Sequence, residues 1–285
     1  MKVINTVTEL QEQLKNRNAS PVGFVPTMGA IHRGHISLVE GAVKRCPIVV
    51  VSIYVNPTQF NDKNDLINYP RTPLTDLEIL EKVLRTGDIV FTPNDKEIYP
   101  EEDKRTFRFG NLDKVMEALQ RPGHFNGVAQ VVSRLFDIVK PDIAIFGQKD
   151  FQQLAVIKKM VADTGSKVHI LGYPIIREED GLAMSSRNVL LEPEIRQNAP
   201  VIFKTLTKAT SMMAENEIRE IRSFVESTIN RVPGFKVEYF EIADDTELVP
   251  VYKHDDMKPG RRYFGCIAVK AGKIRLIDNI EFELA

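Results

Sequence analysis

Short apolar runs alternate with amphipathic stretches through the first 175 residues. Five runs rich in valine and isoleucine lie at 22–25, 48–55, 89–92, 143–146 and 168–171. Their apolar residues are mostly consecutive, which is typical of strands covered on both faces. Between the runs, apolar residues recur three or four positions apart and predict helices at 34–45, 73–85, 127–140 and 150–164. Strand alternating with helix predicts a parallel sheet with right-handed crossovers, that is, a doubly wound α/β fold.

The pattern changes after Pro174. Two helices are predicted at 193–213 and 217–232, and strands follow at 236–242, 262–270 and 273–280, with Ala271-Gly272 as a tight hairpin turn. Helices followed by antiparallel strands indicate a small α+β domain. At about 150 residues per domain, the length of 285 residues also predicts two domains. We therefore expect a Rossmann-like domain over residues 1–175 and a smaller α+β lid domain over 176–285.

Composition narrows the class of protein. Hydrophobic residues make up 43% and charged residues 27%, as in ordinary globular proteins, and the net charge is −1. This balance argues against broad nucleic-acid binding, which needs an excess of cations, but it allows a local basic pocket. The start of the chain lacks the apolar core of a signal peptide, and the most apolar stretch, 46–55, is too short to cross a bilayer. We expect a cytoplasmic protein without membrane attachment. Its two cysteines, Cys46 and Cys266, are interpreted as buried free thiols, with a disulfide as the alternative.

The strongest chemical signal directly follows the first predicted strand. It reads Pro-Thr-Met-Gly-Ala-Ile-His-Arg-Gly-His over residues 26–35 and leads into a helix. Ligands of open α/β sheets bind beyond the carboxyl ends of strands, where helix N-termini attract anions. Gly29 permits a tight turn, Gly34 permits close approach of an anion, and His32 and His35 lie on one face of the helix. Both imidazoles are suited to donate hydrogen bonds to phosphate oxygens. The alternatives are zinc ligation, for which no third ligand is nearby, and a helix cap with incidental histidines.

Two further strand ends carry candidate ligands. Asn56 and Gln59 follow the long second run, and their amides suit a substrate with hydroxyl and carboxylate groups. Asn56-Pro57 is, alternatively, a good turn initiator. Lys149 opens a helix after the fourth run, where a cation opposes the helix dipole unless an anion binds there. We interpret Lys149 as a phosphate ligand, with a solvated surface lysine as the alternative.

The His-x-Gly-His element resembles the signature of the nucleotidylyltransferase superfamily. Together with further segments, the chain resembles the pantothenate synthetase family, whose members join pantoate to β-alanine. The segments that carry this resemblance are Pro-Thr-Met-Gly-Ala at 26–30, Val-Asn-Pro-Thr-Gln-Phe at 55–60, Tyr-Pro-Arg-Thr at 69–72, Arg-Pro-Gly-His-Phe-Asn-Gly-Val at 121–128, Phe-Gly-Gln-Lys-Asp-Phe-Gln-Gln-Leu at 146–154 and Asp-Gly-Leu-Ala-Met-Ser-Ser-Arg-Asn at 180–188. They cover nearly the whole chain in the family's order and spacing.

The resemblance implies an ATP-dependent condensation of (R)-pantoate with β-alanine through a pantoyl adenylate, with release of AMP and pyrophosphate. It also implies Mg²⁺ and a homodimer. The implied catalytic residues are His32, His35, Lys149 and Arg187. ATP-binding is implied for Met28, Gly29, Ala30, Ile31, His32, Arg33, Gly34, His35, Gly147, Gln148, Lys149, Asp150, Ile176, Met184, Ser185, Ser186 and Arg187. Pantoate-binding is implied for Pro26, Thr27, Met28, Gln59 and Gln153, and β-alanine-binding for Gln59. Supporting roles fall to Asn56, Tyr69, Arg121 and His124, and Asp76 is the nearest match to the family's magnesium-binding acidic position.

The segment Met184–Arg187 resembles the mobile second signature of the superfamily. Two hydroxyls and a guanidinium in sequence can surround the β- and γ-phosphates and stabilise departing pyrophosphate. Because this segment falls at the expected domain boundary, we expect the second domain to act as a lid.

The chain departs from the family pattern at Asn61, Asn64 and Gln130, where glycine, an acidic residue and threonine are usual. None of the three is an expected ATP ligand, so we expect the chemistry to be retained and only the loop 61–68 to differ in mobility. Three other classes stay open: a small nucleotidylyltransferase that keeps the nucleotide on its product, a tRNA-charging enzyme and a non-catalytic binding module. No carboxylate identifies itself as the base for the β-alanine amine.

Overall fold

The structure is a computed structural model that describes residues 1–15 and 20–283. It divides into two compact units. The first unit comprises Met1–Phe109, Arg121–Gln148 and Val156–Pro174. The second comprises Gly110–Gln120, Lys149–Ala155 and Ile175–Ala285. The second unit thus takes in two short segments of the amino-terminal half in addition to the stretch that follows Pro174, while the functional division into two domains stays a prediction.

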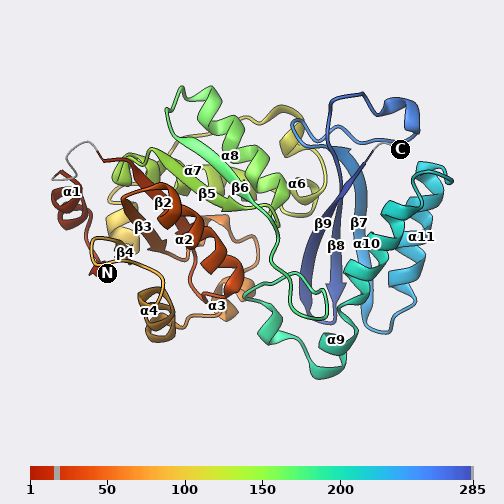
Figure 1. Cartoon of the computed structure of the whole chain (residues 1–285), viewed down its shortest axis with the longest axis horizontal. Coiled ribbons are helices and arrows are strands. Elements are labelled where there is room, and N and C mark those ends of the chain that lie inside the picture. Colours follow the sequence, from red (N-terminus) through yellow and green to blue (C-terminus); the bar gives the residue numbers. More distant parts are fainter. Residues whose placement is uncertain (16–19, 284–285) are drawn as a thin grey trace. The chain divides into compact units, whose positions relative to one another are not determined.

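A six-stranded sheet forms the centre of the first unit, in the order β1-β4-β3-β2-β5-β6 (Figure 1). Its strands are β1 (Lys2–Ile4), β2 (Val22–Thr27), β3 (Ile48–Ile53), β4 (Ile89–Phe91), β5 (Ile143–Gly147) and β6 (His169–Tyr173). All neighbouring strands pair in parallel, as predicted. The sheet gains one strand that the pattern did not predict, because β1 is only three residues long and lies at the edge. The strand order reverses between β2 and β5, and such a reversal creates a ligand-binding crevice at the carboxyl ends of the strands.

Helices cover both faces of this sheet. The helices are α1 (Val7–Lys15), α2 (Arg33–Arg45), α3 (Lys63–Asn68), α4 (Pro73–Glu81), α5 (Asp95–Ile98) and α7 (His124–Val139), with a 3-10 turn, η1, at Pro57–Gln59. Helix α8 (Phe151–Asp163) begins in the second unit and continues in the first. Val25 packs into a buried cluster with residues of α2 and α4, whereas its neighbour Phe24 meets Phe136 of α7 edge to face, with ring centroids 6.2 Å apart. Consecutive strand residues are therefore buried on opposite faces, and the prediction of doubly covered strands is confirmed.

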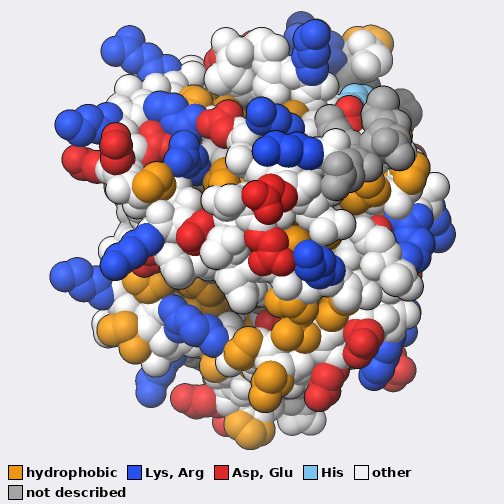
Figure 2. Space-filling model, turned by 90° about the vertical axis from the view of Figure 1, so that its left-hand side faces the viewer, with side chains coloured by type: hydrophobic (Ala, Val, Ile, Leu, Met, Phe, Trp, Pro, Cys, Tyr) orange, Lys and Arg blue, Asp and Glu red, His pale blue; other side chains and the backbone are white. Residues whose placement is uncertain are grey.

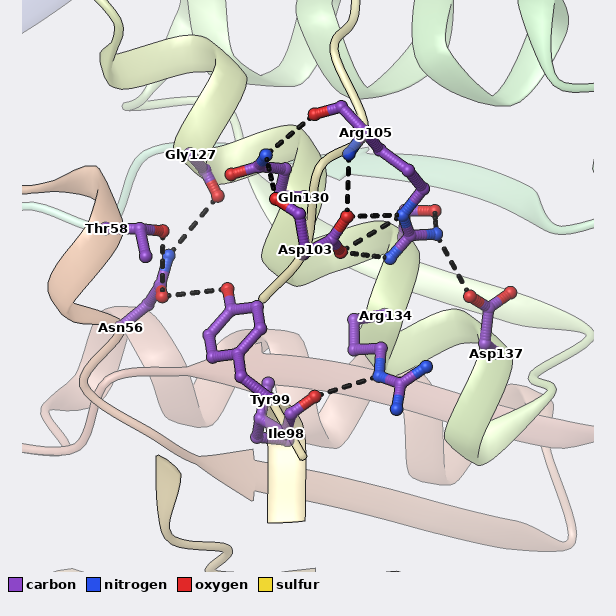
Figure 3. Close-up of polar contacts among 11 residues, drawn as sticks. Asn56, Thr58, Ile98, Tyr99, Asp103, Arg105, Gly127, Gln130, Arg134 and Asp137 are labelled. Atoms are coloured by element: carbon purple, nitrogen blue, oxygen red, sulfur yellow. Dashed lines mark hydrogen bonds and ion pairs between the residues drawn. The ribbon is translucent and has the colours of Figure 1, made fainter. Parts of the chain in front are cut away.

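The loop that follows α5 is fastened to α7 by polar contacts (Figure 3). The Arg105 guanidinium donates to Asp103 and to Ser133 and forms an ion pair with Asp137. The hydrogen bond from Arg105 holds the pKa of Asp103 below its usual value. Gln130 donates through Nε2 to the carbonyl oxygens of Asp103 and Arg105, at 3.0 and 2.7 Å. This contact gives Gln130, one of the departures from the family pattern, a structural role of its own.

The other two departures make one contact each. The Asn61 side chain donates to the carbonyl of Pro122, and the backbone amide of Asn64 donates to Asp62, the N-cap of α3. Asn61 thus ties the loop to the segment before α7, while the effect of both positions on the mobility of the loop stays a prediction. On the face of the molecule shown in Figure 2, basic and acidic side chains are interspersed, so neither sign of charge dominates this face.

The second unit is built on an antiparallel sheet of order β7-β8-β9, as predicted (Figure 1). Its strands are β7 (Phe235–Asp244), β8 (Tyr263–Ala271) and β9 (Ile274–Phe282), and its helices are α6 (Glu117–Gln120), α9 (Pro193–Asn198), α10 (Val201–Ser211) and α11 (Ile218–Asn230), with 3-10 turns at η2 (Gly110–Asp113), η3 (Asn188–Leu190) and η4 (His254–Asp256). Leu206 of α10, Val225 of α11 and Ile267 of β8 share one buried cluster.

Two details of this unit differ from the prediction. The single helix expected over 193–213 is two helices, because Pro200 lacks the backbone N–H that would donate to the preceding turn. The hairpin turn between β8 and β9 lies at Gly272-Lys273, one residue later than predicted.

One buried carboxylate attaches the segment Gly110–Gln120 to the rest of the second unit, and the side-chain amide of Asn111 adds hydrogen bonds to the carbonyl oxygens of Glu247 and Leu248. Glu117 accepts two hydrogen bonds from the Arg275 guanidinium of β9, both at 2.7 Å, and one from the Tyr239 hydroxyl of β7, also at 2.7 Å. Its own amide donates to Gln152, the neighbour of the predicted ligand Gln153. No sequence pattern indicated this long-range attachment.

Cys46 and Cys266 are buried free thiols, as interpreted, and burial raises the pKa of both. None of the described helices combines the length and the apolarity needed to cross a membrane.

Candidate active site

The turn that follows β2 uses a left-handed backbone at two successive residues. Gly29 has φ = 79° and Ala30 has φ = 48°. A Cβ at Gly29 would lie 2.9 Å from a carboxylate oxygen of Asp76, so both the conformation and the close approach require glycine. The Gly29 amide donates to the hydroxyl of Thr27, which in turn donates to the carbonyl of Ser52 in β3, at 2.8 Å. The turn is therefore tight, as predicted, and anchored to the neighbouring strand.

His32 and His35 lie together at the N-terminus of α2. Their rings are stacked with centroids 4.0 Å apart, and His32 is the N-cap residue. Nδ1 of His32 accepts from the amide of Gly34 at 3.1 Å, and Nδ1 of His35 accepts from the amide of His32 at 3.4 Å. The helix cap that the sequence left as an alternative is therefore formed. Because Nδ1 accepts in both rings, the neutral imidazoles carry their protons on Nε2. Capping thus orients two N–H donors and is compatible with anion binding.

Metal ligation by this pair is not supported. Among the described residues, no group of three or more His, Cys, Asp or Glu side chains is arranged to hold a metal ion. The described residues, 1–15 and 20–283, therefore give no support to the zinc alternative.

Asp76, from the first turn of α4, faces the same turn. Its Oδ2 accepts from the amide of Ala30 at 3.0 Å, and its Oδ1 accepts from the amide of Ile31 at 2.8 Å and from the hydroxyl of Thr72 at 3.0 Å. The residue is 1% exposed. A magnesium ligand presents its oxygens to the ion and to water, whereas both oxygens here are directed at N–H and O–H donors. Asp76 therefore does not fit the expected role of a magnesium ligand.

Asn56 holds Gln59 in place. Its amide group donates to Oε1 of Gln59 and to the carbonyl of Gly127, both at 3.2 Å. Its oxygen accepts from Tyr99 and Thr58, and Figure 3 shows these two contacts and the one with Gly127. All four hydrogen bonds that an asparagine amide can make are used, so the Asn56 side chain supports its neighbour. Asn56 is also the N-cap residue of η1, which begins at Pro57, so the turn that the sequence offered as the alternative is formed by the backbone. Gln59 also donates to the sulfur of Met28, which links it to the turn after β2.

His124 supports the backbone of the same glutamine. Its Nδ1 lies 2.8 Å from the carbonyl oxygen of Gln59, and its Nε2 lies 3.1 Å from the guanidinium of Arg121. Because arginine can only donate, Nε2 accepts and the proton lies on Nδ1, directed at Gln59. Helix α7 approaches η1 closely here, since a Cβ at Gly127 would lie 2.6 Å from the carbonyl oxygen of Thr58. Tyr69, another expected supporting residue, is buried against Phe60.

A cavity of about 820 Å³ within the first unit borders this turn. Its lining includes Met28, Gly29 and Asp76, together with Arg71 and Thr72 from the segment before α4. Arg71 donates to backbone carbonyl oxygens of residues 66, 67 and 69 and so closes the end of α3. Met28, Arg71, Thr72 and Asp76 thus line the cavity while each has a hydrogen-bond partner of its own.

Lys149 is attached to β9 in the second unit. The side-chain amide of Asn279 donates to the carbonyl of Lys149 at 3.1 Å. The Lys149 side chain is only 19% exposed, which argues against a solvated surface lysine, and its ammonium lies 3.8 Å from Asp150. Asn279 itself is 3% exposed, so the backbone of Lys149 is held by a buried amide.

The second signature lies in the segment 177–187, which we call the arm. An antiparallel bridge between Arg177 and Ala183 closes this segment into a loop. Arg177 donates to both oxygens of Asp278 at 2.6 and 2.9 Å, and its guanidinium stacks on the ring of Phe203 at 3.6 Å. Burial raises the pKa of Asp278, while Arg177 and Lys149 oppose that rise. Arg196 pairs with Glu178 and Asp180 of the same segment, both at 2.6 Å. Two arginines therefore fasten the arm.

The expected site residues fall on both units. Those in the first unit are Pro26, Thr27, Met28, Gly29, Ala30, Ile31, His32, Arg33, Gly34, His35, Asn56, Gln59, Tyr69, Asp76, Arg121, His124, Gly147 and Gln148. Those in the second are Lys149, Asp150, Gln153, Ile176, Met184, Ser185, Ser186 and Arg187. The structure brings His32 and His35 together, whereas their gathering with Lys149 and Arg187 around one triphosphate stays a prediction.

Comparison with known proteins identifies the family. The model of the family described as pantoate-β-alanine ligase matches residues 2–281. The chain belongs to this family. It is 50% identical to a pantothenate synthetase of Bacteroides fragilis over 285 residues, which covers 99% of each chain, and 49% identical to one of Porphyromonas gingivalis, which covers 99% of this chain and 100% of the relative.

Solved structures of family members have the same fold. A pantoate-β-alanine ligase (pantothenate synthetase) of Thermus thermophilus matches with a TM-score of 0.91 and 41% identity over 100% of both chains. A pantoate-β-alanine ligase of Francisella tularensis, complexed with β-γ ATP and β-alanine, matches with a TM-score of 0.81 and 33% identity over 100% of this chain and 99% of the other. The expected Rossmann-like sheet and smaller α+β part are thus confirmed.

Three residues next to the site were missed by sequence reasoning. Arg177 and Asp278 form the buried pair that fastens the arm, and Asn279 holds Lys149. Asp278 and Asn279 lie a hundred residues beyond the arm, so no local motif links them. The only available signal was an Asp-Asn pair between Ile277 and Ile280 of a predicted strand, where buried polar side chains require partners.

Proposed function

We propose that this chain catalyses the ATP-dependent condensation of (R)-pantoate with β-alanine, through a pantoyl adenylate, in pantothenate biosynthesis. One observation carries the proposal: a chain that matches the ligase family over residues 2–281 presents two stacked imidazoles, each accepting a backbone amide at Nδ1, at the N-terminus of α2. Imidazole N–H donors beyond a parallel strand suit a nucleotide phosphate.

In the first step, the pantoate carboxylate attacks the α-phosphorus of ATP and displaces pyrophosphate. Carboxylic acids titrate near pH ~4, so this nucleophile is already anionic and needs no general base. The remaining task is to hold two anions together and to stabilise the charge that develops on the phosphate. We assign that task to Nε2–H of His32 and His35 and to the cations of Lys149 and Arg187, with the second unit acting as a lid.

In the second step, the amine of β-alanine attacks the acyl carbon and expels AMP. We assign Gln59 to the binding of both pantoate and β-alanine, because Asn56 and Met28 fix its amide group while His124 fixes its backbone. The proton that the amine must lose passes to water or to the phosphate of the adenylate. The Francisella relative, complexed with β-γ ATP and β-alanine, supports both as ligands of this chain.

The proposal includes Mg²⁺ bound with ATP, a homodimer and a cytoplasmic location. Phosphate oxygens and water hold most of the shell of this ion in many ATP sites, so the proposal does not need Asp76 as a ligand. The two buried free thiols suit a reducing compartment.

The test is a product analysis. Purified protein is incubated with ATP, Mg²⁺, pantoate and β-alanine, and nucleotides and pyrophosphate are separated by chromatography. We expect AMP, pyrophosphate and pantothenate in equal amounts, with no pantothenate when any substrate is omitted. Formation of ADP would exclude adenylation. Retention of the nucleotide on the final product would favour a nucleotidylyltransferase instead.

A further inference from the structure

We propose that Asp76 is a positioning residue that holds the Gly29–Ile31 turn and, through it, the histidine pair at the start of α2. The inference deepens the proposed function, because it concerns the same phosphate-binding turn. It replaces the metal-ligand role that the family pattern had indicated for this carboxylate.

Both carboxylate oxygens of Asp76 accept hydrogen bonds from the protein. Two backbone amides and one hydroxyl donate to its oxygens at 2.8 to 3.0 Å, from Ala30, Ile31 and Thr72. Within the described part of the chain, no Lys or Arg forms an ion pair with it. A carboxylate that is 1% exposed and lacks a counter-cation depends on such directed donors, because an unsatisfied buried charge is strongly unfavourable.

The turn in its own right is unfavourable without this support. A left-handed conformation is disfavoured for a residue with a Cβ, and Ala30 adopts one next to left-handed Gly29. Successive amides in such a conformation converge and form a concave anion-binding site. Asp76 occupies that concavity from within the protein, so the amides of Ala30 and Ile31 are directed at the carboxylate and not at a substrate.

The support continues into the histidine pair. Ile31 directly precedes His32, whose extended backbone (φ = −133°, ψ = 175°) lets its ring cap Gly34 and its amide donate to His35. Rotation of the peptide at Ile31 would turn His32 out of the cap and release Nδ1 of both rings. Asp76 holds this peptide from a rigid element, since Thr72 is the N-cap of α4 and accepts from the amide of Asp76. Preorganised sites are typically supported in this way.

The decisive variant is Asp76→Asn. An asparagine keeps the shape but has one acceptor oxygen, so whichever way the amide lies, the amide of Ala30 or of Ile31 faces an NH₂ group. Displacement of a catalytic group by about 1 Å costs about 100-fold in rate, and we expect kcat/KM for ATP to fall by that order. The KM for β-alanine and the Mg²⁺ concentration for half-maximal rate are expected to stay within twofold of the wild-type values.

Two companion variants interpret that result. Glu78→Gln makes the same change of charge at an exposed position of the same helix and is expected to leave activity unchanged. Thr72→Val removes only the hydroxyl donor and leaves both amides on the carboxylate, so we expect kcat/KM for ATP to fall by about 3- to 10-fold. If Asp76→Asn fails to fold, Thr72→Val still tests the proposal, because a purely structural role would lower its thermal midpoint without changing kcat/KM at a temperature where it is folded.

A second measurement does not depend on activity. In the wild-type protein, ¹⁵N resonances of the imidazoles of His32 and His35 are expected to report Nε2–H tautomers, and the amides of Ala30 and Ile31 to exchange slowly. Asp76→Asn is expected to change both. An unchanged tautomer pattern together with wild-type kcat/KM would overturn the positioning role, and an increased Mg²⁺ requirement alone would restore the metal-ligand role. Absence of AMP formation by the wild-type protein would refute the proposed function and leave this measurement valid.

Discussion

The two parts of the proposed site are stabilised by different forces. The turn and histidine pair of the first unit are held by neutral donors on one buried carboxylate and by backbone amides on imidazole nitrogens. The arm of the second unit is held by two arginines paired with Asp278, Glu178 and Asp180. Directed neutral hydrogen bonds fix geometry and respond little to salt. Of the ion pairs on the arm, the partly exposed pairs of Arg196 are screened by salt, whereas the buried pair of Arg177 with Asp278 is screened much less. This difference is what we expect if the turn and the histidine pair are preorganised while the arm of the proposed lid changes its conformation.

Removal of Arg177 should have the largest effect on this comparison. Arg177→Met leaves Asp278 buried without its main cation, and loss of one partner of a buried pair typically costs about 3–5 kcal/mol. Burial already raises the pKa of Asp278, and the variant should raise it further. Because a carboxyl with a raised folded pKa loses its contribution to stability as pH rises, the penalty should be larger at neutral pH than in acid. Urea unfolding at several pH values measures it.

The matched control for that variant is Arg262→Met, which breaks a more exposed pair with Glu281 in the same sheet. Exposed pairs contribute about 0–1 kcal/mol, so a comparable loss in both variants would mean that the arm is not held by its buried pair in particular.

Removal of an imidazole tests the part of the site in the first unit that neutral hydrogen bonds hold. His35→Ala should abolish adenylate formation while the fold stays intact, because loss of one preorganised donor commonly costs ~3–4 kcal/mol, or 100- to 1000-fold in rate. Pyrophosphate release and circular dichroism are the measurements. Near-wild-type turnover of the folded variant would remove His35 from the mechanism.

Asn279→Ala tests whether a neutral hydrogen bond also fixes geometry in the second unit. It removes the amide that holds the carbonyl of Lys149, and an unsatisfied buried carbonyl costs about 1–3 kcal/mol. We expect kcat to fall about 10-fold while the KM for β-alanine is retained. Asn216→Ala, at a half-buried position with a single weak side-chain contact, is the control. An equal loss of kcat in both would show that Lys149 does not depend on Asn279.

The smallest expected effect concerns an ion pair in the first unit, away from the turn. Arg105 lowers the pKa of Asp103, so this carboxyl stabilises the fold above its ordinary pKa and loses that contribution as pH falls through the lowered value. The pair is partly exposed, and Asp103→Asn should cost about 1 kcal/mol at neutral pH. Unfolding free energies of the two proteins should converge as pH falls to about 3. A difference that grows in acid would contradict this assignment.

Local patterns predicted most of the architecture. Consecutive valines and isoleucines at 22–25 and 48–55 indicated doubly covered strands, because only burial on both faces tolerates such runs. The short edge strand at residues 2–4 and the break at Pro200 were missed, the first because three residues carry little pattern and the second because helical periodicity continues across the proline. The histidine pair was found because motif, strand end and helix start coincide within ten residues.

What the sequence by itself determined is the set of chemical groups: two imidazoles three residues apart, a lysine after a strand and a Ser-Ser-Arg arm. The tertiary structure alone decided how Asp76 and Asn279 are used, because each makes its decisive contacts with residues 45 or more positions away. In a sequence, an aspartate that binds a cation cannot be distinguished from one that accepts three hydrogen bonds. Only the surrounding chain decides whether the carboxylate binds a metal ion or accepts protein hydrogen bonds. Burial excludes water, so a buried carboxylate must take its partners from the groups that the fold places beside it.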